Sequence, residues 1–169
     1  MSESVIYGIK EGQKTKWLTS FKNGRGLSLM VWAAYFKQYL GLDHFERMLD
    51  YSDYDKLWPL YKDSRLPHHH KTVLLATYDY TVIPVGMLPS FVADLEAWDA
   101  DMSGFIDGYV NHVPDLAVYL KAKDLSQFDF IGIQVNSGVD NQYDVNWNPR
   151  GRKGVKPGEL KNIYDLMRE

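Results

Sequence analysis

The segment LSLMVWAAYFKQYL, residues 27–40, is apolar on nearly every face of the helix that it would form. A surface helix keeps a polar face, so this composition predicts a helix that is buried on more than one side. Gly41 follows directly and is a natural C-terminal cap, because glycine readily adopts the left-handed conformation required there. We therefore predict that residues 27–40 form the central core helix of the protein.

The segments outside this helix divide into strands and further helices. Residues 5–10 alternate apolar and polar side chains, and residues 71–83 and 128–135 are rich in β-branched and aromatic residues. We predict a strand over each of these segments, with residues 143–147 returning as the second strand of a hairpin. Helix signals cover residues 44–50, 53–58, 91–98, 115–123 and 157–167.

This order of segments predicts an α+β fold with one domain over residues 1–169. We expect a mixed or antiparallel sheet of about four strands, covered by helices. With 45% hydrophobic residues, the 169-residue chain can bury a sizeable core, and without cysteine it can form neither disulfides nor thiolate metal sites. It shows no signal-peptide pattern and no apolar run of about eighteen residues, so we predict a cytoplasmic protein with no membrane contact.

Charge is unevenly distributed along the chain. The net charge is only −3, yet no Lys or Arg occurs between Thr72 and Leu120. If the acids of this segment share one face, they would attract a basic protein surface. If they point in several directions, they only solvate the surface. The candidate partner-binding residues are Asp94, Glu96, Asp99, Asp101 and Asp107.

Part of this acidic segment, DADMSGFIDGYV at residues 99–110, has the spacing of a calcium loop. Positions one, three, five, six, eight and nine are Asp99, Asp101, Ser103, Gly104, Ile106 and Asp107. The segment resembles an EF-hand loop, which implies a calcium ion held by Asp99, Asp101, Ser103 and Asp107; the alternative prediction is that the protein has no cofactor. The loop requires the preceding helix to end at Trp98. Val110 stands where an EF-hand has a bidentate glutamate, and the alternative is an acidic helix end followed by a Ser-Gly turn.

Three consecutive histidines precede the strand predicted over residues 71–83. On an extended chain His68 and His70 would point to one side, and two imidazoles are a reasonable start for a zinc site. The third ligand would come from His112 or an aspartate. His68, His70 and His112 are also the candidate catalytic acids or bases. The alternative is an exposed loop that leads into the strand.

A basic loop near the C-terminus supplies candidate phosphate ligands. Arg150, Arg152 and Lys153 lie in a segment punctuated by glycine and proline, and an ordinary solvated loop is the alternative. So few cations in an acidic chain make nucleic acid an unlikely partner.

Two functional hypotheses follow. The first is a non-catalytic interaction protein, an inhibitor or adaptor, that docks its acidic and aromatic surface on a partner protein with a basic surface. The alternative is a small enzyme, with or without a metal ion, that acts on a phosphorylated or nucleotide-like substrate through its histidines and the basic loop. The 24 Phe, Trp and Tyr residues also leave room for a homo-oligomer, such as a symmetric dimer.

Overall fold

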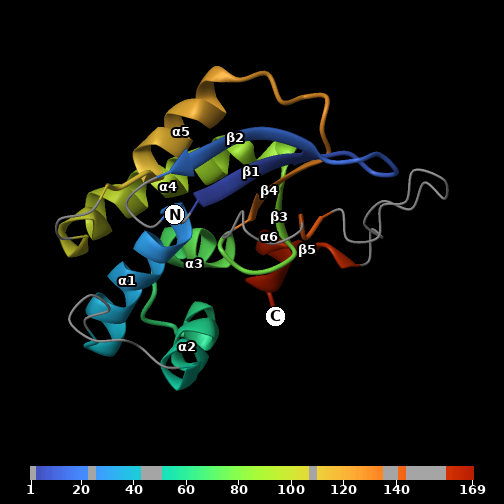
Figure 1. Cartoon of the computed structure of the whole chain (residues 1–169). Coiled ribbons are helices and arrows are strands. Elements are labelled where there is room, and N and C mark those ends of the chain that lie inside the picture. The colour runs from blue at the N-terminus through green and yellow to red at the C-terminus, as the bar shows by residue number, and fades with distance from the viewer. Residues whose placement is uncertain (1–2, 23–25, 43–50, 107–109, 135–140, 144–158) are drawn as a thin grey trace.

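The computed structural model describes residues 3–22, 26–42, 51–106, 110–134, 141–143 and 159–169. Within these residues the fold is built on a mixed five-stranded sheet in the order β2-β1-β4-β3-β5 (Figure 1). The strands are β1 (Glu3–Ile9), β2 (Lys16–Lys22), β3 (Thr81–Pro84), β4 (Phe130–Gln134) and β5 (Lys161–Asn162). The first four strands pair antiparallel, and β5 joins β3 in parallel. The predicted α+β fold with a mixed sheet is confirmed.

The two faces of the sheet contribute to two cores. Ile6, Ile83 and Ile133 pack with the helices in the main hydrophobic core. Val82, adjacent to Ile83 on β3, belongs instead to a smaller cluster with Tyr143. Because successive side chains of a strand point to opposite faces, this division places the helices on one face and Tyr143 on the other.

The predicted core helix is α1 (Gly26–Leu40). Ala34, Tyr35 and Phe36 are fully buried, which confirms that the helix packs on more than one side. At its start the Leu27 amide donates to the buried hydroxyl of Ser4 on β1 at 3.0 Å. This bond satisfies one of the backbone donors that a helix leaves unpaired at its N-terminus. At its end Gly41 has φ 64°, the left-handed conformation expected of a C-terminal glycine.

The remaining helices surround α1 and the sheet. They are α2 (Tyr51–Leu57), α3 (His68–Leu75), α4 (Leu88–Met102), α5 (Val113–Ala122) and α6 (Ile163–Leu166), with 3₁₀ turns at Trp58–Lys62, Val85–Met87 and Ser103–Phe105. α4 buries Phe91, Leu95, Trp98 and Met102, whose spacing of three and four residues places them on one helical face. Helix α4 contacts both α3 and α5, and Trp98 on its buried face stacks on Tyr35 of α1.

The prediction of one long strand over residues 71–83 is wrong. Its first part lies in α3, and only Thr81–Pro84 is extended, as β3. A short apolar run such as VLLA has no period that separates helix from strand, and β-branched composition was a weak guide. The helix forms because Val73, Leu74 and Leu75 are all buried against helical neighbours, and tertiary packing overrides local preference.

Other predicted boundaries also changed. Helix α4 continues through Met102 instead of ending at Trp98. A helix was predicted over residues 157–167; among its described residues, 159–167, residues 161 and 162 form β5 and only Ile163–Leu166 is α-helical. Strand β2 had no counterpart in the prediction. Of the hairpin strand predicted over residues 143–147, only Tyr143 is described, and it lies in a turn. Residues 144–147, the predicted helix at 44–50 and the basic residues Arg150, Arg152 and Lys153 lie outside the described residues.

Among the described residues, no helix combines the length and apolar composition needed to cross a membrane. The cytoplasmic location and the homo-oligomer stay predictions.

Candidate metal centre

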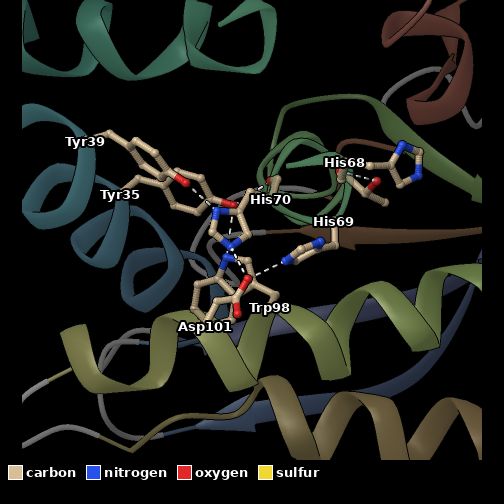
Figure 2. Close-up of polar contacts among 8 residues, drawn as sticks. Tyr35, Tyr39, His68, His69, His70, Trp98 and Asp101 are labelled. Carbon is tan, nitrogen blue, oxygen red and sulfur yellow. Dashed lines mark hydrogen bonds and ion pairs between the residues drawn. The ribbon is translucent and has the colours of Figure 1, made fainter. Parts of the chain in front are cut away.

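Three helices bring polar side chains together at the beginning of α3 (Figure 2). The first turn of α3 carries His68, His69 and His70. The C-terminal half of α4 supplies Asp101, and α1 supplies Tyr39. Thus residues that are about thirty positions apart in the sequence meet because the three helices cross there.

Asp101 is the centre of this cluster. Its Oδ2 atom lies 2.6 Å from Nε2 of His69 and 3.2 Å from Nε2 of His70. These three atoms lie within 4.8 Å of one another, so each residue directs one potential metal ligand toward a common point. The Asp101 side chain is 49% exposed, whereas that of His70 is 5% exposed. The cluster therefore has a buried side formed by His70 and a solvent-accessible side at Asp101.

The position of His70 is fixed by two tyrosines on α1. The Tyr39 hydroxyl lies 2.5 Å from Nδ1 of His70. The Tyr35 hydroxyl donates to the His70 carbonyl oxygen at 2.5 Å and accepts a hydrogen bond of 2.9 Å from Nε1 of Trp98. Because Tyr35 and Trp98 are fully buried, the backbone of α3 is held at a defined distance from α1 and α4. Both ring nitrogens of His70 thus have a partner.

The surroundings of the cluster favour neutral His70 beside an ionised Asp101. Burial lowers the pKa of His70, and the nearby His69 acts in the same direction. The hydrogen bond from His69 lowers the pKa of Asp101, which is further stabilised by His70. A neutral imidazole and a carboxylate are the protonation states that bind a metal ion.

Acidification should therefore destabilise the metal-free protein through His70. In the unfolded chain His70 takes up a proton near pH 6.5, whereas the folded protein resists protonation until a lower pH. The contribution of neutral His70 to the free energy of unfolding is complete above the pKa of the unfolded chain. It is lost as the pH falls through the pKa of the folded protein. Melting temperatures in chelator should fall as the pH is lowered through the unfolded pKa of 6.5 and beyond it. His70→Gln should flatten this dependence, and His68→Gln should not; equal slopes in both variants would contradict the assignment.

The other sequence candidates have separate partners. Nε2 of His68 lies 3.6 Å from Oδ2 of Asp94. Burial raises the pKa of Asp94, and the nearby His68 opposes that shift. His112 is not in the cluster: its Nδ1 lies 2.9 Å from Asp115 and its Nε2 lies 3.1 Å from the Lys22 carbonyl oxygen. Of the two kinds of third ligand considered from the sequence, His112 lies apart from the consecutive histidines, whereas an aspartate, Asp101, lies beside them.

The acids of the proposed docking surface also have partners within the chain. Glu96 pairs with Lys121, and Asp99 accepts a hydrogen bond from Asn111 at 2.5 Å. Asp101 contacts two histidines, as described above. Docking on a basic partner stays a prediction, and these internal contacts would have to be broken or shared for it to occur. Asp107 lies outside the described residues.

The loop conformation expected of an EF-hand is absent from residues 99–102. These residues form the last turn of α4, and Ser103–Phe105 continues as a 3₁₀ turn. In a helix Asp99 and Asp101 point about 200° apart around the axis, so they cannot converge as alternate loop ligands do. The helical positions of Asp99 and Asp101 therefore do not fit the predicted calcium coordination, whereas Asp101 does enter a candidate metal cluster.

His69 was missed as a candidate because the histidines were expected on a strand. There His69 would point away from His68 and His70. In α3 the side chains are spread around a helix, and His69 and His70 both reach Asp101 on α4. A helical interpretation of residues 68–75, following Pro67, would have brought His69 into consideration.

Comparisons of this chain with protein-family models, with curated proteins and with solved structures give no match.

Proposed function

We propose that this protein binds a divalent transition-metal ion, with zinc the best candidate, through His69, His70 and Asp101. The main support for this proposal is that two imidazole nitrogens and one carboxylate oxygen lie within 4.8 Å of one another. Imidazole and carboxylate are ordinary zinc ligands, and the absence of cysteine makes this the ligand chemistry open to the chain. The proposal takes up the metal-dependent alternative inferred from the sequence, with a different set of histidines.

The spacing of the ligand atoms is close to that of a zinc site. Ligands at about 2.0–2.1 Å from a tetrahedral ion are about 3.4 Å apart. The distance from His70 Nε2 to Asp101 Oδ2 is already 3.2 Å, whereas that from His69 Nε2 is 2.6 Å. His69 must therefore withdraw by less than about 1 Å. Its side chain is 23% exposed, which leaves it more room to move than His70 has.

The Tyr39 hydroxyl is placed to orient a histidine that binds the metal ion. A metal-bound histidine usually donates its other ring N–H to a fixed oxygen, which sets the tautomer and the ring orientation. The Tyr39 hydroxyl lies in that position at Nδ1 of His70. With zinc on Nε2, His70 would donate from Nδ1 and the Tyr39 hydroxyl would accept. The buried half of the site is thus arranged before an ion enters.

Three protein ligands leave a fourth position for water or a substrate. Structural zinc sites are usually closed by four protein ligands, whereas catalytic sites keep one position open. The exposed side of Asp101 would place this position toward solvent. A zinc-bound water is a nucleophile near neutral pH, so hydrolysis is the reaction class that such a site would support.

Zinc should raise the melting temperature of metal-stripped protein. At a free zinc concentration about 100 times the dissociation constant, the expected stabilisation is about 2.7 kcal/mol. Calorimetric titration should give one site per chain. His70→Ala and Asp101→Asn should each abolish the melting shift, because each removes one of three ligands.

The chain supplies close controls for both variants. His68→Ala removes a neighbouring histidine that contacts Asp94, and Asp99→Asn changes an acid that contacts Asn111. Both controls should keep the zinc shift. Because Asp101 is half exposed, Asp101→Asn tests the site even if loss of the buried His70 impairs folding. An unchanged zinc shift in Asp101→Asn, or no shift in the wild-type protein, would reject the proposal.

A further inference from the structure

A second site lies at the opposite end of α3 from the histidines. It is a pocket of about 510 Å³, and among the described residues Trp32, Trp58, Tyr61 and Tyr78 form most of its aromatic lining. Leu75, the last residue of α3, also lines it, whereas His69 and His70 belong to the first turn of that helix. The pocket volume falls in the range of small-molecule sites. The pocket is therefore a candidate ligand site that is separate from the metal centre.

Neighbouring aromatic rings of this pocket are nearly perpendicular to one another. Trp32 and Trp58 meet at 87° with centroids 5.2 Å apart, and Trp58 and Tyr78 meet at 84° and 5.0 Å. Tyr61 and Tyr78 meet at 82° and 6.1 Å. Rings at right angles line a cavity from more than one direction. Ring faces carry partial negative charge and ring edges partial positive charge, so the faces of this lining that no neighbouring ring edge covers favour a cation.

Much of the hydrogen-bonding capacity of the lining is used within the protein. Nε1 of Trp32 donates to the Thr77 hydroxyl at 2.7 Å, and that hydroxyl donates to the Leu74 carbonyl oxygen at 2.6 Å. The Tyr78 hydroxyl donates to the Trp58 carbonyl oxygen. The rings are thus fixed by their polar ends. A ligand that needs no hydrogen bonds would lose least by leaving water for this pocket.

Two exposed charged residues line the same pocket, Asp79 and Lys161. Asp79 would attract a cationic ligand, whereas Lys161 would repel it. Tyr61 also contacts a cation outside the pocket lining, because Nζ of Lys62 lies 5.4 Å from the centre of its ring. The electron-rich ring faces and Asp79 therefore both attract a cation, whereas Lys161 repels it.

We propose that this pocket binds a small organic cation with a quaternary ammonium group, held by the faces of Trp32, Trp58, Tyr61 and Tyr78 and by the charge of Asp79. Such a group has a diffuse positive charge and no N–H donor. It matches a lining that offers aromatic faces and one carboxylate. The inference does not depend on the metal centre, and either site can be disproved without the other.

Choline and its neutral isostere 3,3-dimethylbutan-1-ol test the proposal, because they have nearly the same shape and differ in charge. In calorimetric titrations choline should bind at one saturable site, about tenfold more tightly than the isostere. The N-methyl proton resonance of choline should move upfield as the protein is added, since the methyl groups would lie over ring faces. Equal affinity for the two probes would mean an apolar pocket without cation recognition and would overturn the proposal.

Two substitutions at the pocket should act with opposite signs. Asp79→Asn should weaken choline binding several-fold, and Lys161→Gln should strengthen it, because one removes an attraction and the other a repulsion. Both side chains are exposed, so neither change should impair folding. Trp17→Phe, at an exposed tryptophan that does not line the pocket, should leave the affinity unchanged. Reversed signs, or no saturable choline binding by the wild-type protein, would also overturn the proposal.

Discussion

Replacing Trp98 with alanine should lower the free energy of unfolding by about 3–5 kcal/mol. Trp98 is among the largest fully buried side chains among the described residues, and it stacks on Tyr35 with ring centroids 6.3 Å apart. The substitution would leave a cavity between α1 and α4. It would also remove the indole N–H that donates to the Tyr35 hydroxyl. Urea denaturation monitored by far-ultraviolet circular dichroism would measure the change.

Two further tryptophan variants separate the causes of this loss. Trp98→Phe keeps most of the ring volume but removes the N–H donor, and should cost about 1–2 kcal/mol. Trp17→Ala changes a tryptophan that is 56% exposed on β2, and should cost no more than about 0.5 kcal/mol. If Trp98→Ala were no more destabilising than Trp17→Ala, the packing of α4 against α1 described here would be wrong.

Gly132→Ala should be severely destabilising although it adds one methyl group. A Cβ atom on Gly132 would lie 2.3 Å from Cζ of Tyr143 and 2.6 Å from its hydroxyl oxygen. Tyr143 cannot move aside easily, because it is fully buried and its hydroxyl donates to the Thr81 carbonyl oxygen at 3.0 Å. Overpacking of this kind costs about 1–3 kcal/mol and occasionally more. We expect a loss at or above about 3 kcal/mol in urea denaturation, since β4 lies inside the sheet.

Another glycine supplies the control for this prediction. At Gly86 an added Cβ atom would meet no atom within 4 Å, and its φ is not in the left-handed region. Gly86→Ala should therefore be neutral or slightly stabilising. Combining Gly132→Ala with Tyr143→Ala should cost less than the sum of the two single changes, because the clash is removed. Simple additivity would show that Tyr143 is not the obstacle.

The histidine cluster shows how local secondary structure changes a functional inference. The alternating arrangement assumed for a strand selected His68 and His70 and rejected His69. The helix instead gives His69 and His70 a common partner in Asp101 and gives His68 a separate one in Asp94. The sequence singled out His70 and Asp101 as candidate site residues and missed His69. It could not pair them, because the contact joins residues on two helices whose packing depends on the rest of the core.

The aromatic pocket had no sequence signal. Trp32 lies on α1, Trp58 begins a 3₁₀ turn, and Tyr78 follows α3, so no short motif contains them. In the sequence they look like ordinary core residues, and part of each ring does serve the core. What distinguishes them is the perpendicular arrangement and the nearby Asp79, which are properties of assembled elements.

By itself the sequence determined the elements whose side-chain pattern has one physical solution. Residues 27–40 are apolar all round and could only be stable as a buried helix, and the apolar strand at 128–135 was recognised from its β-branched and aromatic composition, with β4 at Phe130–Gln134. The tertiary structure decided the segments whose pattern was compatible with two conformations, above all residues 68–75. There the burial of Val73, Leu74 and Leu75 outweighed local preference, and the resulting helix brought His69 and His70 to Asp101.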